Sequence, residues 1–157
     1  MNTFSRRAVL FLVTGAGVGY LPRLPGTLGT LVAIPLSLAL NRIAVNNFAL
    51  AVSIAAGSIF CAIALSTQGA RFLKQKDPQI IVIDEIVGFV IANFLAPPRW
   101  PVVLASFVLF RFFDIAKIFP TNRLERLAGG AGIVLDDVMA GVYTLVSVRL
   151  LLNMGWI

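Results

Sequence analysis

The sequence predicts an all-α fold, a polytopic membrane helical bundle of about four to five spans with a short N-terminal helix and an interfacial helix. Apolar residues make up 59% of the 157 residues and charged residues only 13%, and the mean hydropathy is +0.92. Soluble domains carry about 25% charged residues, and a soluble chain of this size could not bury so much apolar surface. Residues 1–157 are therefore expected to form one integral-membrane domain.

The charged residues and the missing residue types narrow the function classes. Thirteen Lys and Arg residues face seven acidic ones, a net charge of +6. Because the basic residues are interleaved with apolar spans, they indicate membrane topology and attraction to anionic lipids rather than binding of nucleic acid. The chain contains no histidine, which excludes imidazole metal ligands and histidine acid–base catalysis. The single Cys61 lies within a span, so the sequence offers neither a disulfide framework nor a cysteine metal cluster.

The N-terminal third is predicted to hold a helix, a loop and a first span. In residues 1–19, Arg6-Arg7 precedes an apolar run that resembles a signal peptide, but no small-x-small cleavage site follows. This segment is predicted to be a short membrane-surface or partly inserted helix. The glycines and prolines of residues 15–26 predict a loop. A short first span is expected at 27–41, with Pro35 as a kink.

Four later spans are predicted from apolar runs that polar turns and prolines separate. No charge occurs between Arg42 and Arg71, and Pro97-Pro98 ends a further apolar run. Trp100 suits an interfacial anchor at the start of the next span. Residues 120–127 alternate apolar and basic side chains, which is typical of an interfacial helix. The spans are expected at 47–66, 82–96, 100–117 and 135–152.

The basic residues assign the two faces of the membrane. If successive spans alternate in direction, one face holds ten Lys and Arg residues and the other holds three. Cytoplasmic loops are enriched in basic residues, so the ten-residue face is predicted to be cytoplasmic. The ten are Arg6, Arg7, Arg23, Arg71, Lys74, Lys76, Arg111, Lys117, Arg123 and Arg126, and the three are Arg42, Arg99 and Arg149.

Six of the seven acidic residues fall at the same cytoplasmic depth, at the ends of three different spans. Charged side chains at the membrane are costly and usually face a polar cavity, a partner or a metal. Clustered carboxylates suit a hard divalent cation such as Mg²⁺. The six are Asp77, Asp84 and Glu85 before or at the third span, Asp114 near the end of the fourth, and Asp136 and Asp137 at the start of the fifth.

Cationic and helix-terminal groups near these acids suit a phosphate. Arg111 lies three residues before Asp114 and Lys117 three residues after it, which puts all three on one helical face. The segment with Gly26, Thr27 and Thr30 leads into a helix N-terminus, where free N–H groups and the dipole favour anions.

Simpler interpretations of single features remain open. Asp136 and Asp137 could cap the fifth span, and Asp84 could cap the third. Arg111 and Asp114 could form a buried ion pair. Independent capping does not explain why nearly every acid in the chain collects at one depth, and this conjunction favours a functional site.

Four blocks of the sequence resemble the phosphatidylglycerophosphatase A family of bacterial membrane lipid phosphatases. They occur in family order over most of the chain, although the chain lacks a histidine often found before the Asp-Glu pair and has Ile118 where many members have proline. The missing histidine makes histidine catalysis unexpected here, and Ile118 affects only local backbone shape. The blocks are Gly17–Thr30, Asp77–Gly88, Phe110–Lys117 with Pro120, and Gly130–Gly141.

The resemblance implies one lipid phosphatase domain over residues 1–157, with Mg²⁺-dependent removal of the terminal phosphate of phosphatidylglycerophosphate to give phosphatidylglycerol. It implies a multi-pass protein of the bacterial cytoplasmic (inner) membrane with the active site facing the cytoplasm. The expected partners are the membrane and a phospholipid phosphomonoester, without nucleic acid, and no oligomeric state is predicted. Direct attack by water and an aspartyl-phosphate intermediate both stay open. The absence of a Cys-x5-Arg motif argues against cysteine-phosphatase chemistry.

Each candidate residue then has a role. Four carboxylates are expected to hold Mg²⁺ and to act in catalysis: Asp84, Glu85, Asp136 and Asp137. Asp114 is expected to be either a further ligand or the base that activates water. Arg111 and Lys117 are expected to bind the phosphomonoester, which the loop with Gly26, Thr27 and Thr30 would steady.

Two other function classes are consistent with the same residues. A small metal-ion transporter would use the carboxylates for permeation, and a non-catalytic scaffold would not need so many of them. The depth of the carboxylates in the membrane distinguishes a transporter from a lipid phosphatase. Transport sites usually lie near the bilayer midplane, whereas these acids are predicted at one interface.

Overall fold

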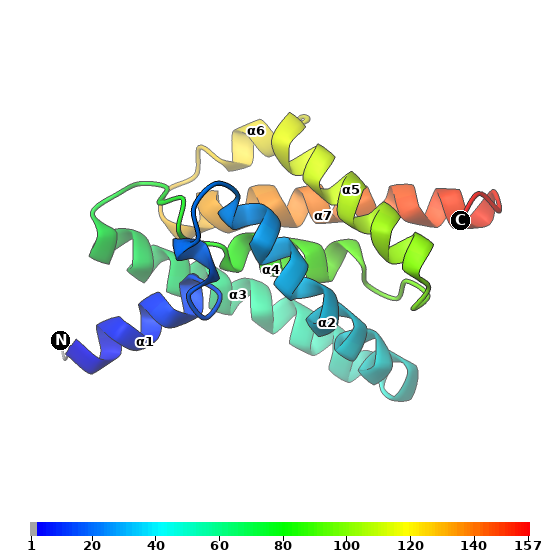
Figure 1. Ribbon diagram of the computed structural model, residues 1–157, viewed down its shortest axis with the longest axis horizontal. Coiled ribbons are helices and arrows are strands. Elements are labelled where there is room, and N and C mark those ends of the chain that lie inside the picture. Colours follow the sequence, from blue (N-terminus) through cyan, green and yellow to red (C-terminus); the bar gives the residue numbers. More distant parts are fainter. Residues whose placement is uncertain (1–2) are drawn as a thin grey trace.

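The computed structural model describes residues 3–157, and all of its regular structure is helical (Figure 1). The predicted all-α class is therefore confirmed for this part of the chain. Met1 and Asn2, part of the predicted N-terminal helix, lie outside the described residues. The helices are α1 (Thr3–Val13), the 3₁₀ turn η1 (Val18–Tyr20), α2 (Pro25–Asn46), α3 (Phe48–Leu73), α4 (Ile83–Ala92), α5 (Trp100–Ala116), α6 (Thr121–Leu124) and α7 (Gly130–Asn153).

Three of these helices, α2, α3 and α7, are long and apolar enough to cross a membrane. All three exceed their predicted spans, and in α2 and α3 this is because polar residues beyond the bilayer do not by themselves end a helix. α2 begins at Pro25, where proline suits the first helical turn, and continues past residue 41 to Asn46. α3 continues past Ser66 until Lys74 adopts a left-handed conformation with φ of 54°.

The third predicted span was wrong in length, because α4 has only ten residues and ends at Ala92. The backbone that follows is not helical, and the buried side chain of Asn41 on α2 satisfies it. The Asn41 amide nitrogen donates to the carbonyl oxygens of Asn93 at 2.8 Å and Ala96 at 3.3 Å. The N–H of Leu95 donates to Asn41 Oδ1 at 2.7 Å. Irregular backbone at membrane depth needs such partners, because lipid offers none.

Asn41→Leu is expected to destabilise the protein by about 1–3 kcal/mol, because the carbonyl and N–H groups after α4 would lose their buried partner. Thermal unfolding in detergent checks this. Asn46→Leu is the matched control: Asn46 is exposed, and its amide donates to the Arg42 carbonyl of its own helix. Equal melting temperatures for the two variants would contradict this role of Asn41.

The C-terminal helices differ from prediction in two places. The expected interfacial helix at 120–127 is the four-residue α6, and Thr121 within it is buried. α7 begins at Gly130, five residues before the expected start, so Asp136 and Asp137 lie in its second turn. Gly129 is the N-cap, and the alternative in which these two aspartates cap the helix is therefore wrong. Val82 caps α4, so Asp84 is not its N-cap either.

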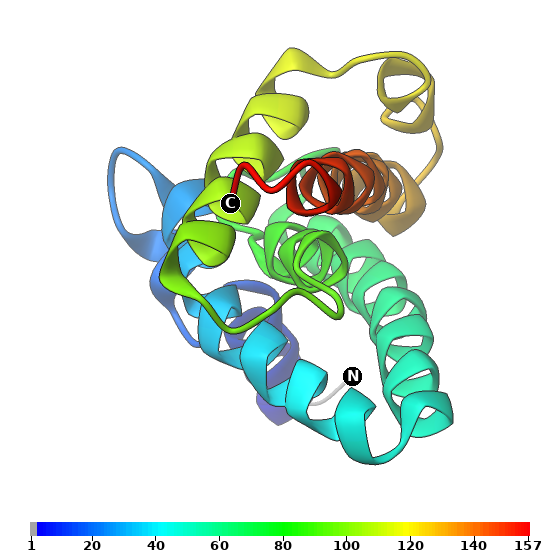
Figure 2. The ribbon, with the colours of Figure 1, turned by 90° about the vertical axis from the view of Figure 1, so that its right-hand side faces the viewer.

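α4 lies in the middle of the bundle, between α2, α3, α5 and α7 (Figure 2). It packs most closely against α7, through two glycines. A Cβ at Gly88 would lie 2.7 Å from the Asp137 carbonyl oxygen, and a Cβ at Gly141 would collide with the Gly88 carbonyl. Small residues allow backbones to approach in this way. Each glycine is four residues after an aspartate, Asp84 or Asp137, so the contact lies about one turn from both carboxylates.

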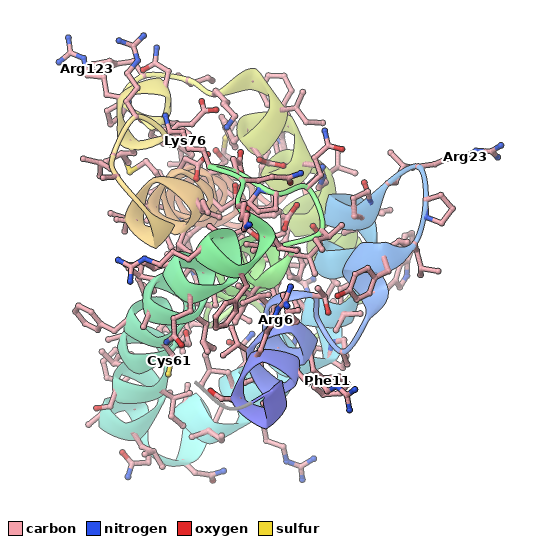
Figure 3. The ribbon with its side chains drawn as sticks, turned by 90° about the vertical axis from the view of Figure 1, so that its left-hand side faces the viewer. Arg6, Phe11, Arg23, Cys61, Lys76 and Arg123 are labelled. Carbon is pink, nitrogen blue, oxygen red and sulfur yellow. The ribbon has the colours of Figure 1, made fainter. Side chains whose placement is uncertain are left out.

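The connections gather at two ends of the bundle (Figure 1). Residues 74–82 and 117–129 lie in the left-hand half, whereas the C-terminal end of α2, residues 93–99 and the C-terminus lie to the right. Figure 3 views the left-hand side, where Arg6, Arg23, Lys76 and Arg123 are labelled. The helices α2, α3, α4, α5 and α7 thus run in alternating directions, as the charge argument required.

Candidate active site

A polar pocket of about 370 Å³ lies where the N-terminal ends of α2, α4 and α7 meet the C-terminal end of α5. The same six acidic residues that the sequence places at one depth all line it. Two cationic side chains from α5 and its C-cap line the pocket as well. These residues are Asp77, Asp84, Glu85, Asp114, Asp136 and Asp137, with Arg111 and Lys117.

Three of the carboxylates form a tight group, here called the carboxylate trio: Asp84, Glu85 and Asp137. One oxygen from each lies within 4.8 Å of the others. Asp84 and Asp137 are buried, and Glu85 is half-buried. Asp84 Oδ1 and Glu85 Oε2 are buried and have no hydrogen-bond partner among the described residues. Three acids cannot be held this way as bare anions, because unpaired buried charge is strongly unfavourable. The arrangement fits a hard divalent cation, which prefers oxygen ligands.

Asp136, the fourth predicted ligand, has a different neighbour. Its Oδ2 accepts a hydrogen bond from Lys117 Nζ at 2.8 Å, and the same ammonium lies 3.3 Å from Glu125 Oε2. Burial would lower the pKa of Lys117, but the hydrogen bonds and charges of Asp136 and Glu125 outweigh it and raise the pKa above its usual value. Lys117 is therefore a fixed cation on the pocket wall. The Asp136 Oδ1 atom is buried without a partner among the described residues.

Arg111 and Asp114 form the ion pair that the sequence left open. Arg111 Nη1 lies 2.7 Å from Asp114 Oδ2, and both side chains are mostly buried. The contact lacks hydrogen-bond alignment, because Nη1 has no hydrogen-bond partner among the described residues. Both residues also line the pocket, so the ion pair is part of the site rather than an alternative to it.

Gly26, Thr27 and Thr30 lie in the first turns of α2 instead of in a loop, which corrects their predicted setting. A Cβ at Gly26 would collide with Glu85 and lie 3.1 Å from Arg111 Nη1, so only glycine lets these two side chains approach the helix. Thr27 lines the pocket. Thr30 is fully buried and donates to the Gly26 carbonyl at 2.8 Å, so it supports the turn from outside the pocket.

Two charged residues of the pocket have no role in the sequence prediction. Asp77 was grouped with the other acids by depth, but nothing in its spacing assigned it a task. Arg23 belongs to the pocket rim, and its side chain projects away from the helices in Figure 3. A signal for Arg23 existed, since it is the only charged residue between Arg7 and Arg42.

Comparison with known proteins decides the family. The sequence profile named Phosphatidylglycerophosphatase A matches residues 11–152, a range that contains every residue of the pocket. The chain belongs to the phosphatidylglycerophosphatase A family. The family resemblance is thereby confirmed, and every candidate residue lies within the shared region.

Curated members and relatives of the phosphatidylglycerophosphatase A family match at the same level. The proteins named phosphatidylglycerophosphatase A from Escherichia coli and Haemophilus influenzae are each 35% identical to this chain, over 83% and 87% of it and over 76% and 84% of their own lengths. A Bacteroides thetaiotaomicron protein is 35% identical over 86% of this chain and 87% of its own length. Its name carries a provisional assignment as a phosphatidylinositol-3-phosphatase. No solved structure matches the chain.

Proposed function

We propose that this protein is a Mg²⁺-dependent phosphatase that removes the terminal phosphate from phosphatidylglycerophosphate and so forms phosphatidylglycerol, acting at the cytoplasmic face of the bacterial inner membrane. Membership of the family and the names of two curated relatives support the reaction and the lipid. The observation that carries the proposal is the pocket itself, where six carboxylates and three cations meet at one end of an apolar bundle.

The carboxylate trio supports Mg²⁺ as the cofactor. The trio offers only oxygen ligands, and one oxygen of each residue lies close to the others. Asp84 Oδ1 and Glu85 Oε2 have no hydrogen-bond donor among the described residues, and Mg²⁺ prefers such free carboxylate oxygens. When bound, the ion would stabilise negative charge on the phosphoryl oxygens and lower the pKa of a coordinated water. Asp84 and Glu85 from α4 and Asp137 from α7 would hold it, with Asp136 within the same pocket.

The phosphate would be held by three groups on the pocket wall. Arg111 and Lys117 each contact carboxylates already, but a guanidinium has five N–H donors and an ammonium three, so donors remain for phosphate oxygens. The N-terminal turn of α2 has no side-chain cap, which leaves the N–H groups of Gly26 and Thr27 suited to an anion. The pairs with Asp114 and Asp136 keep both cations positioned before substrate binds.

In the hydrolysis, a water oxygen bonds to phosphorus and the bond between phosphorus and the terminal glycerol oxygen breaks. Asp114 would accept the proton of the water and return it to the leaving oxygen. Its Oδ2 contacts Arg111, which leaves Oδ1 for this transfer. Neither histidine nor a cysteine in the pocket competes for the role, because the chain has no histidine and Cys61 lies in α3.

The cytoplasmic orientation is supported by charge. The end of the bundle with the pocket carries ten of the thirteen basic residues, and this bias is typical of the cytoplasmic side. The transporter alternative is disfavoured, because the acids lie at helix ends rather than near the middle of the bundle.

The deciding experiment measures phosphate release by the purified protein in detergent. Phosphatidylglycerophosphate should be hydrolysed in Mg²⁺, hydrolysis should stop in EDTA, and added Mg²⁺ should restore it. Phosphatidylinositol 3-phosphate, the lipid in the name of the Bacteroides relative, serves as the competing substrate and should react more slowly. Undiminished phosphate release in EDTA would contradict the proposed Mg²⁺ dependence. A faster reaction with phosphatidylinositol 3-phosphate would contradict phosphatidylglycerophosphate as the preferred substrate.

A further inference from the structure

An apolar groove runs along the bundle between α2 and α5. Its cavity has a volume of about 450 Å³, and its walls come from the facing sides of the two helices. Leu38 and Pro98 also line an adjacent apolar cavity of about 520 Å³, so the hollow continues toward the opposite end of the bundle. The groove residues used below are Leu31, Ile34 and Leu38 from α2 and Val103, Leu104 and Phe107 from α5.

The groove continues the helix faces that form the polar pocket. On α2, Leu31 follows the pocket residue Thr27 by four positions, which places them one turn apart on the same side. On α5, Phe107 precedes the pocket residue Arg111 by four positions. From Thr27 to Leu38 the helix rises about 16 Å, roughly half the hydrocarbon thickness of a bilayer. A molecule in both sites would therefore have a polar head and an apolar tail.

We propose that this groove binds an acyl chain of the substrate lipid while the headgroup phosphate occupies the polar pocket. The inference rests on the proposed function and deepens it. The charges fit, because the cations Arg111 and Lys117 lie at the headgroup end and none of the groove residues named above is charged. The groove is also open to lipid, since Leu31 is 47% exposed and Leu104 51%.

A further apolar cavity of the protein lacks this continuity. The cavity of about 310 Å³ lined by Phe94, Leu95 and Leu150 lies near the end of the bundle opposite the carboxylates. Its first residue on α7, Leu145, lies about two turns after the pocket residue Asp137, so its walls do not adjoin the polar pocket as those of the groove do. The groove between α2 and α5 is thus where the structure allows a lipid tail to contribute binding energy to the reaction at its head.

The test uses a bulky residue that fills the groove and a matched one that does not. Leu104→Trp places an indole in the groove, whereas Ile54→Trp adds the same group to an exposed position of α3, outside the groove. Each variant is assayed with dioleoyl phosphatidylglycerophosphate and with its deacylated, water-soluble counterpart. We expect Leu104→Trp to lower kcat/KM about tenfold or more for the lipid and to leave kcat/KM for the deacylated substrate unchanged, and we expect Ile54→Trp to resemble wild type on both substrates.

Two results would overturn the proposal that the groove binds an acyl chain of the substrate. One is equal kcat/KM for the lipid in both variants, and the other is an equal loss on both substrates, which would mean that the tryptophan distorts the pocket. Absence of phosphate release by wild type from either substrate would instead refute the proposed function.

A binding measurement tests acyl-chain binding in the groove independently of phosphate release. Phosphatidylglycerophosphate with a diazirine on one acyl chain should crosslink to peptides of α2 and α5. Unlabelled phosphatidylglycerophosphate should compete, and phosphatidylcholine should not. Equal competition by phosphatidylcholine would identify an ordinary surrounding lipid and overturn the inference.

Discussion

Asp84→Asn is expected to abolish phosphate release, a loss of at least about a hundredfold, while the protein still inserts and folds. Asparagine keeps the size of the side chain and removes its charge, so the carboxylate trio loses one anionic oxygen donor. Changes in groups that only support metal ligands already cost about 10–100-fold. The fold should not suffer, because Asp84 Oδ1 has no hydrogen-bond partner among the described residues.

The measurement pairs phosphate release with thermal unfolding in EDTA. Removing one of three crowded carboxylates relieves repulsion in the metal-free protein, so the variant should melt no lower than wild type. Asp77→Asn is the comparison, since Asp77 is exposed at the pocket and stands outside the trio, and its effect should stay within about tenfold. Near-normal turnover of the Asp84 variant would refute the assignment of this site.

The convergence of the acids was predictable because it depends on features that each act locally. Apolar runs locate the spans, alternation and basic residues assign the ends, and a spacing of three puts Arg111, Asp114 and Lys117 on one face. Together they place carboxylates from three helices at one depth, and a single pocket contains them all. The predicted depth was enough to bring these residues together, because side chains at the same end of a small bundle lie close to one another.

The division of labour among the acids was not predictable, because it depends on which helices are neighbours. Asp136 and Asp137 are adjacent, so they point about 100° apart around α7. Asp137 therefore faces α4 and joins Asp84 and Glu85, while Asp136 faces the C-terminal end of α5 and bonds Lys117. Both residues looked alike in the sequence.

The length of α4 depends on a contact of the same long-range kind. Its residues are apolar enough to continue a span, but the helix ends at Ala92 because Asn41 satisfies the backbone that follows. Asn41 precedes Asn93 by 52 residues, and no local pattern connects them. The packing of Gly88 against Gly141 was likewise not predictable, because no local pattern in the sequence connects the two residues.

Gly141→Ala is expected to destabilise the protein by about 1–3 kcal/mol and to lower phosphate release together with stability, although it adds only one methyl group. Its Cβ would collide with the Gly88 carbonyl, and backbone cannot move aside as a flexible side chain can. α4 would have to shift from α7, which would separate Asp84 from Asp137 one turn away. Misplacement of catalytic groups by about 1 Å can cost about 100-fold in rate.

Gly57→Ala is the matched control within the same bundle. Gly57 also lies inside a long helix, α3, but a Cβ there would meet nothing within 4 Å. Alanine is the better helix former by about 1 kcal/mol, so this variant should be as stable as wild type or more so and should keep its activity. The two substitutions therefore have opposite expected signs in thermal unfolding. If Gly141→Ala raised the melting temperature as Gly57→Ala does, close contact between α4 and α7 would not be what holds the carboxylate trio together.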